Sequence, residues 1–176
     1  MSGAVRVRPI DAADRPAVRA IVLERWGSPI AVGHGTVFEP GELPGFLAER
    51  DGRPVGLLTY EVRGDTLEVV SIDAFPARGG TGTALLEAAV RAAREEHGCR
   101  RVVLTTTNDN VDALRFYQRR GFRLVALRAG ALEATRRIKP GLPERRARHP
   151  AARRARARTR GLTGAAAPSL NCRGRG

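Results

Sequence analysis

The first apolar residues of the chain follow two different periods. From Val5 to Ile10 they occupy every second position, which is typical of a half-buried strand. The next ones recur at helical spacing and predict a helix that Asp11 or Asp14 caps and that ends near Trp26 and Gly27. The apolar side of this helix consists of Val18, Ile21, Val22 and Leu23.

The middle of the chain predicts a loop followed by an antiparallel meander. Residues 28–44 are rich in Gly and Pro and show no periodicity, so we expect a loop or a short helix there. Strand-like patterns then follow, separated by the turn pairs Asp51-Gly52 and Gly64-Asp65. The three predicted strands are Gly45 to Arg50, Pro54 to Val62 and Thr66 to Phe75.

The second half of the chain alternates helices and strands. A Gly-rich turn at residues 76–83 leads directly into a helix, on which Leu85, Ala88, Ala89, Ala92 and Ala93 form one apolar side. Beyond it the pattern predicts a strand over Arg101 to Thr107, a helix over Val111 to Arg120 that Gly121 ends, a strand over Phe122 to Arg128, and a helix over Ala131 to Lys139.

The Gly-rich turn is a candidate anion site. Consecutive glycines at a helix N-terminus leave backbone amides pointing outward, where phosphate oxygens bind well. Thr81 and Thr83 could add hydroxyl hydrogen bonds, and Arg78 could add a positive charge. A turn that needs glycines only for tight packing is the other interpretation. The turn lacks the Gly-Lys-Ser/Thr of a Walker loop, and Leu85 stands where a dinucleotide fingerprint has its third glycine.

A second segment carries a resemblance. Residues 110–122, with Asn110, Ala113, Tyr117, Gly121 and Phe122, follow the pattern Asn-x-x-Ala-x-x-x-Tyr-x-x-x-Gly-Phe. Together with Gly80-Thr81-Gly82, this segment resembles the GNAT superfamily of acetyl-CoA-dependent N-acetyltransferases over about residues 5–139. The two motifs combined are far more specific than either one.

The resemblance implies a fold and a cofactor site. The fold is α/β: a central mixed, mostly antiparallel sheet, splayed at the cofactor site and flanked by helices. Acetyl-CoA is the implied co-substrate, bound through its pantetheine along Ile72, Asp73 and Ala74. Its diphosphate is expected on the Gly-rich turn, and no metal is expected. The implied cofactor-binding residues are Ile72, Asp73, Ala74, Arg78, Gly79, Gly80, Thr81, Gly82, Thr83 and Asn110.

The turn departs from the family pattern at one position. Where relatives carry Gln or Arg three places before the first glycine of Gly-x-Gly, this chain has Ala77, and its arginine, Arg78, comes one place later. We therefore interpret the turn as shortened. The amides of residues 79–83 are then expected to supply most of the phosphate contacts, with Arg78 as a further candidate.

The resemblance also implies direct attack of an amine on the thioester, an oxyanion held by a backbone amide, and Tyr117 as the catalytic residue beside the leaving thiolate. Proton transfer from a phenol of pKa ~10 to a thiolate of pKa ~8.5 costs about 2 kcal/mol, so a hydrogen bond to the thiolate serves equally well. Core packing beside Phe116 is the alternative role of Tyr117.

An alkyl amine is protonated at neutral pH, so a base or a water chain must first remove a proton. Glu61, Glu68 and Asp73 are candidates on the predicted strands. Alternation places Glu68 and Asp73 on opposite faces unless a bulge intervenes, and surface charge is the simpler interpretation of each. His34 is expected in an exposed loop and Trp26 in the core or a lid.

Charge divides the chain into two parts. Of its 176 residues, 31 are Lys or Arg and 18 are Asp or Glu, a net charge of +13. Residues 1–139 contain 21 basic and 17 acidic residues, whereas residues 140–176 contain 10 basic and 1 acidic. The resemblance implies an N-acetyltransferase domain over 1–139, and the charge predicts a disordered basic tail over 140–176. The tail lacks aromatic residues that would stack bases, which argues against a nucleic-acid partner.

A frameshift is our hypothesis for the tail. Related sequences of this branch do not become basic here, and residues from Glu144 onward, back-translated and shifted by one nucleotide, can spell a family-like continuation. The family's last strand would then be missing, and the strands at 101–107 and 122–128 would keep unpaired edges.

Several function classes stay open at this point. The favoured one is an N-acetyltransferase for a small-molecule or peptide amine. A nucleic-acid-associated protein acting through its tail and an inactive CoA-binding protein are the alternatives. With two cysteines, no leader-like N-terminus and no apolar run of ~18 residues, we expect a cytoplasmic protein without a membrane anchor. The acceptor cannot be inferred, and a homodimer is compatible with the resemblance.

Overall fold

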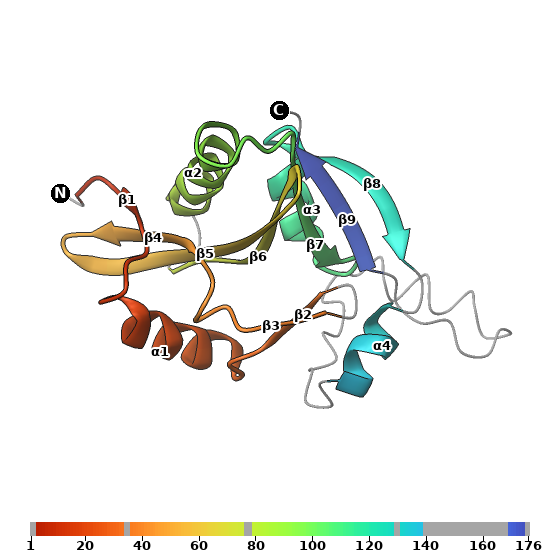
Figure 1. The fold of residues 1–176 in the computed structure, drawn as a ribbon, viewed down its shortest axis with the longest axis horizontal. Helices are drawn as coiled ribbons and strands as arrows, with labels where there is room; N and C mark the ends of the chain where they lie inside the picture. Colours follow the sequence, from red (N-terminus) through yellow and green to blue (C-terminus); the bar gives the residue numbers. More distant parts are fainter. Residues whose placement is uncertain (1–2, 34–35, 76–78, 129–130, 139–168, 175–176) are drawn as a thin grey trace, which may run out of the picture.

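The computed structural model describes residues 3–33, 36–75, 79–128, 131–138 and 169–174. They form one seven-stranded sheet and one two-stranded sheet, with helices on both faces of the larger sheet (Figure 1). In chain order the elements are β1 (Arg6–Pro9), α1 (Arg15–Trp26), β2 (Ala31–Gly33), β3 (Thr36–Phe38), β4 (Gly45–Arg50), β5 (Arg53–Arg63), β6 (Thr66–Ala74), α2 (Thr81–Glu95), β7 (Arg101–Thr107), α3 (Val111–Gln118), β8 (Arg123–Arg128), α4 (Ala131–Ile138) and β9 (Ser169–Gly174).

The strands of the larger sheet run in the order β1-β4-β5-β6-β7-β9-β8. All neighbouring strands are antiparallel except β6 and β7, which are parallel and are connected through α2. Parallel neighbours need such a crossover, and a helix is its usual form. The expected mixed, mostly antiparallel sheet with flanking helices is therefore confirmed.

Two helices cover opposite faces of the β4–β6 part of the sheet (Figure 1). Neighbouring residues of β5 point to opposite faces, so Leu57 packs with Val18 and Val22 of α1 while Leu58 belongs to the core under α2. The apolar side of α2 is fully or nearly fully buried: Leu85, Leu86, Ala88, Ala89, Ala92 and Ala93. Its alanines let this helix approach the sheet closely.

The start of α1 is tied to the sheet by an ionic network. Arg8 of β1 donates to Asp14 at 2.6 and 2.8 Å and to Glu49 of β4 at 2.8 Å. These hydrogen bonds hold the pKa of Asp14 well below its usual range. Asp14 therefore pairs with Arg8, while the Asp11 carboxylate accepts from the amides of Ala13 and Asp14. Gly27 ends α1 in the left-handed region, φ +64, as its sequence position predicts.

The expectation of a loop or short helix over residues 28–44 is wrong in one respect, because this segment contains the β2–β3 hairpin. Each strand has three residues, too few for a periodic pattern to show. His34 lies outside the described residues, so its expected loop position stays a prediction.

The expectation of unpaired edges on β7 and β8 is also wrong. Strand β9 lies between them and pairs antiparallel with both (Figure 1). Extended backbone of almost any sequence can fill such a slot, since the pairing groups are main-chain amides and carbonyls. This strand belongs to the segment expected to be disordered, so that expectation fails for residues 169–174. Residues 139–168 lie outside the described part of the chain.

Candidate active site

The Gly-rich turn has the backbone that its sequence predicts. Gly79 and Gly80 have φ of +106° and +83°, conformations that residues with a side chain rarely adopt. The first bond into α2 runs from the amide of Ala84 to the carbonyl of Gly80, 2.9 Å. The amides of residues 79–83 donate to no other residue in the described part of the chain. They are thus the open amides of a helix N-terminus, where the helix dipole favours an anion.

The turn borders a cleft of about 740 Å³. Its walls come from the end of β6, the start of α2 and much of α3. Every predicted cofactor residue that the structure describes lines this cleft, as does the predicted catalytic tyrosine: Ile72, Asp73, Ala74, Gly79, Gly80, Thr81, Gly82, Thr83, Asn110 and Tyr117. Arg78 lies outside the described residues.

Close packing of α2 and α3 shapes this cleft. A Cβ on Gly82 would lie 3.2 Å from Phe116 Cζ, so a side chain there would push the two helices apart. Asn110 caps α3, its side-chain oxygen accepting from the amide of Ala113 at 3.4 Å. A capping role therefore accompanies its place in the cleft wall.

Arg120 is a site residue that sequence reasoning missed. Its guanidinium lies 3.7 Å from the ring centroid of Phe116 and donates to Thr83 Oγ1 and to the Phe116 carbonyl. It therefore places a positive charge at the first turn of α2, next to the open amides. Only the close contact of α2 with the end of α3 brings it there, and no local pattern signals that contact.

The two threonines of the turn behave differently. Thr81 is 3% exposed, and its methyl group would lie 2.7 Å from a Cβ added at Gly56 of β5. Its side chain therefore packs against the sheet, so its amide is the group that it offers to the cleft. Thr83 Oγ1 accepts from Arg120, which leaves its own hydroxyl hydrogen available to a ligand.

Strands β6 and β7 diverge beside the cleft. They pair only over residues 66–69 and 101–104, although β6 continues to Ala74. Beyond Val69, no described strand pairs with the edge of β6 that faces β7. This open edge presents main-chain donors and acceptors to any extended molecule that enters between the strands.

The same strand contains a bulge. Thr59 of β5 pairs with Ser71 and Tyr60 pairs with Val69, so Val70 is an extra residue on β6. The extra residue removes the alternation that would separate Glu68 from Asp73. Both now lie on the α1–β2 side, where Asp73 accepts from Arg25 of α1 at 2.8 Å and Glu68 Oε1 would lie 3.8 Å from a Cβ at Gly33 of β2.

Asp73 and Glu61 are ion-paired rather than simple solvated charges. Asp73 pairs with Arg25, and Glu61 lies 2.6 Å from Arg63. Both carboxylates stay partly exposed, so they are surface charges that each have an arginine partner. Glu68 lies directly opposite Glu61 in the sheet register.

Tyr117 lies where two cavities meet. It is 7% exposed, packs against Phe116 and Phe122 with ring centroids 5.2 and 6.0 Å away, and lines the large cleft. It also lines a second cavity of about 160 Å³ at the point where β6 and β7 diverge. Core packing and contact with both cavities are thus combined in one side chain.

The walls of the second cavity combine apolar side chains with polar groups. This cavity is lined by Trp26, Val69, Val70, Ser71, Ile72, Leu104, Thr105 and Tyr117. The Ser71 hydroxyl lies 2.6 Å from that of Thr59. Trp26 both packs against the core under α1 and lines this cavity.

In the described part of the chain no helix is long and apolar enough to span a bilayer.

Comparison with known proteins gives one family. The model of the acetyltransferase (GNAT) family matches residues 12–122. Uncharacterized proteins YdhI and YxbD of Bacillus subtilis (strain 168) are both 42% identical, over 123 and 127 residues. These alignments cover 69% and 72% of this chain and 76% and 79% of the relatives.

Solved structures share the fold. An IAA acetyltransferase from Bacillus cereus superposes with a TM-score of 0.67 at 16% identity, covering 98% of this chain and 99% of the other. A GNAT family acetyltransferase from Elizabethkingia anophelis, solved with acetyl-CoA bound, superposes with a TM-score of 0.62 at 14% identity, covering 97% of each chain.

Proposed function

The chain belongs to the GNAT acetyltransferase family, and from this premise we propose that it transfers an acetyl group from acetyl-CoA to an amine by direct attack in a ternary complex. The observation that carries the proposal is a single cleft. It brings the open amides of residues 79–83 and the ring of Tyr117 together from parts of the sequence about thirty residues apart.

The turn fits the diphosphate of CoA. Five successive amides without a described partner, at the positive end of a 15-residue helix, offer hydrogen bonds and a favourable dipole. Arg120 adds a full charge at the same place, and guanidinium groups bind phosphate oxygens strongly. The absence of a Cβ at Gly80 keeps the approach open, whereas its absence at Gly82 makes room for Phe116.

The open edge of β6 suits the pantetheine arm. Its amide groups resemble a peptide backbone, so it can pair with residues 72–74 as an extra strand would. An amide on this strand is then available to stabilise the oxyanion that develops on the thioester carbonyl. The acetyl group is thereby directed toward the junction of the two cavities, at Tyr117.

The acceptor amine enters through the smaller cavity in this proposal. Tyr117 lines both that cavity and the main cleft, so its phenol can donate a hydrogen bond to the sulfur as the thiolate departs. None of the described residues that line the smaller cavity is a carboxylate, so in this proposal the ammonium proton leaves through water or through a group beyond that lining. A small-molecule or peptide amine fits these requirements.

A matched pair of glycine variants tests the cradle. Gly80 and Gly64 both have positive φ, +83° and +58°, and a Cβ added to either would have no atom of the other described residues within 4 Å. Alanine at either position should cost about 1 kcal/mol of stability. Only Gly80→Ala should also raise the Kd for acetyl-CoA, by about tenfold or more, because it displaces the amides. Titration calorimetry measures both variants against the parent.

The activity itself is tested by following free thiol. Acetyl-CoA is mixed with the protein and with a panel of alkylamines, aminoglycosides, amino acids and peptides with free N-termini. At least one amine should release CoA faster than water does. The proposal would be overturned if the parent protein neither binds acetyl-CoA nor releases thiol with any amine. An unchanged Kd for acetyl-CoA in Gly80→Ala would show that the diphosphate does not bind at this turn.

A further inference from the structure

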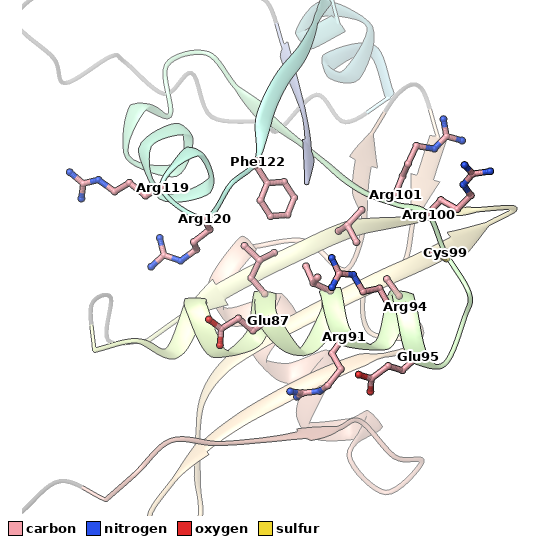
Figure 2. Close-up of a pocket in the computed structure, with 14 residues that line it drawn as sticks. Glu87, Arg91, Arg94, Glu95, Cys99, Arg100, Arg101, Arg119, Arg120 and Phe122 are labelled. Carbon is pink, nitrogen blue, oxygen red and sulfur yellow. The ribbon is translucent and has the colours of Figure 1, made fainter. Parts of the chain in front are cut away.

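A second groove lies on the outer side of α2, beyond the cleft. It has a volume of about 580 Å³ and lies between α2, the start of β7 and the turn from α3 to β8 (Figure 2). We name it the arginine groove. It is lined by Leu86, Glu87, Val90, Arg91, Ala93, Arg94, Glu95, Cys99, Arg100, Arg101, Val102, Arg119, Arg120 and Phe122.

The arginine groove is strongly cationic. Six of its lining residues are arginines and two are glutamates. Arg101 pairs with Asp65, and Arg120 is held by Thr83 and Phe116. The side chains of the other four, Arg91, Arg94, Arg100 and Arg119, make no hydrogen bond or ion pair with a described residue. Most of the positive charge is therefore available to an outside anion.

The positive charges are spread along the groove. Figure 2 shows Arg119 and Arg120 at one end, Arg100 and Arg101 at the other, and Arg91 and Arg94 on the helix between them. Leu86 and Arg94, eight residues apart on α2, are about 12 Å apart along the helix axis. A single phosphate cannot contact both ends, so the arrangement suits an elongated ligand with several separated anionic groups.

Two features favour a polypeptide over a nucleic acid. Phe122 is only 4% exposed and Phe116 is covered by Arg120, so the groove offers no aromatic face on which a base could stack. Glu87 and Glu95 also interrupt the positive charge along α2. A polyphosphate backbone carries a charge at every unit and would be repelled there, whereas a peptide places carboxylates only at some positions.

We propose that the arginine groove binds an acidic segment of a partner protein, in which carboxylates alternate with apolar side chains. The carboxylates meet the guanidinium groups in charge-assisted hydrogen bonds. The apolar side chains cover half-buried Val90 and the aliphatic stems of the arginines. The groove shares Arg119 and Arg120 with the cleft, whereas its other four arginines line the groove and not the cleft, so the acidic segment binds mainly outside the acetyl-CoA site.

The test uses the full chain and three labelled probes. The first is a fluorescent peptide of alternating Glu and Leu, about eight residues long, enough to span the groove at ~3.3 Å per residue. The second carries Gln in place of Glu, and the third is a uridine oligonucleotide of equal charge. Fluorescence anisotropy gives the Kd of each. The parent should bind the acidic peptide and not the Gln peptide, and more weakly at high salt.

Charge-reversal variants locate the binding. Arg91→Glu with Arg94→Glu should weaken binding of the acidic peptide by about tenfold or more. The control is Arg6→Glu with Arg128→Glu, two exposed arginines outside the groove that give the same change of net charge. The double variant Arg91→Gln with Arg94→Gln removes the same two positive charges without adding glutamates. It therefore also tests the loss of charge if the glutamates disturb α2. Binding equal in groove and control variants, or tighter binding of the oligonucleotide, would overturn the proposal.

Discussion

At the scale of single residues, Tyr117 combines ring packing in the core with a proposed catalytic role. Its ring contacts Phe116 and Phe122, and it lines both the cleft and the smaller cavity. Removing the whole side chain would therefore create a void as well as remove the phenol. A substitution that keeps the ring separates the two contributions.

Tyr117→Phe is that substitution. The ring stays, so the melting temperature should change little, and acetyl-CoA affinity should hold because the amides of residues 79–83 are untouched. The kcat should fall about tenfold or more, since the departing thiolate loses its hydrogen-bond donor. Steady-state kinetics at saturating acetyl-CoA measure this. An unchanged kcat would leave Tyr117 with a packing role only.

Residue chemistry was predictable where it depends on local backbone. Gly79 and Gly80 predict the left-handed turn, and the spacing from Asn110 to Phe122 identifies the second motif. Arg120 was not predictable, because its place at the start of α2 depends on how two helices pack. The role of Arg78, in contrast, stays a prediction.

At the scale of elements, the bulge at Val70 decides which side chains share a face. Strict alternation separates Glu68 from Asp73, and a sequence pattern gives no sign of one extra residue inside an otherwise regular strand. The strands themselves, with their turns at Asp51-Gly52 and Gly64-Asp65, follow from local residues. The existence of the meander strands β4, β5 and β6 was thus predictable, and their register was not.

Helix α2 is positioned by its contact with β5. A Cβ on Gly56 would lie 2.7 Å from Thr81 Cγ2 and 3.0 Å from the carbonyl of Asp73. Gly56→Ala should therefore destabilise the protein by about 1–3 kcal/mol and raise the KM for acetyl-CoA, because the first turn of α2 must shift. Urea unfolding and steady-state kinetics check the two effects.

Gly33→Ala is the matched control for that change. Gly33 also lies in a strand, but a Cβ there would meet its nearest atoms at 3.5 and 3.8 Å, which are ordinary contacts. Its stability and its KM should stay close to those of the parent. Equal KM values in the Gly56 and Gly33 variants would show that the contact with β5 does not position the phosphate turn.

At the scale of the whole molecule, charge and architecture divide the chain differently. The excess of arginine after residue 139 suggested a separate tail, yet residues 169–174 return to the sheet. Composition cannot reveal such a return, because the slot between β7 and β8 is filled through backbone hydrogen bonds that any extended segment without proline can make. The frameshift hypothesis concerns the origin of this segment and stays a prediction.

Removing residues 169–176 should therefore destabilise the protein. Strands β7 and β8 pair with β9 over most of their length and would lose those hydrogen bonds together. We expect a lower melting temperature, faster amide exchange in β7 and β8, and aggregation through the exposed edges. Removing only residues 175–176 leaves β9 intact and serves as the control. Equal amide exchange rates in β7 of the two truncated proteins would show that β9 does not stabilise the sheet. The core under α1 and α2 would then be enough by itself to keep the cleft in place.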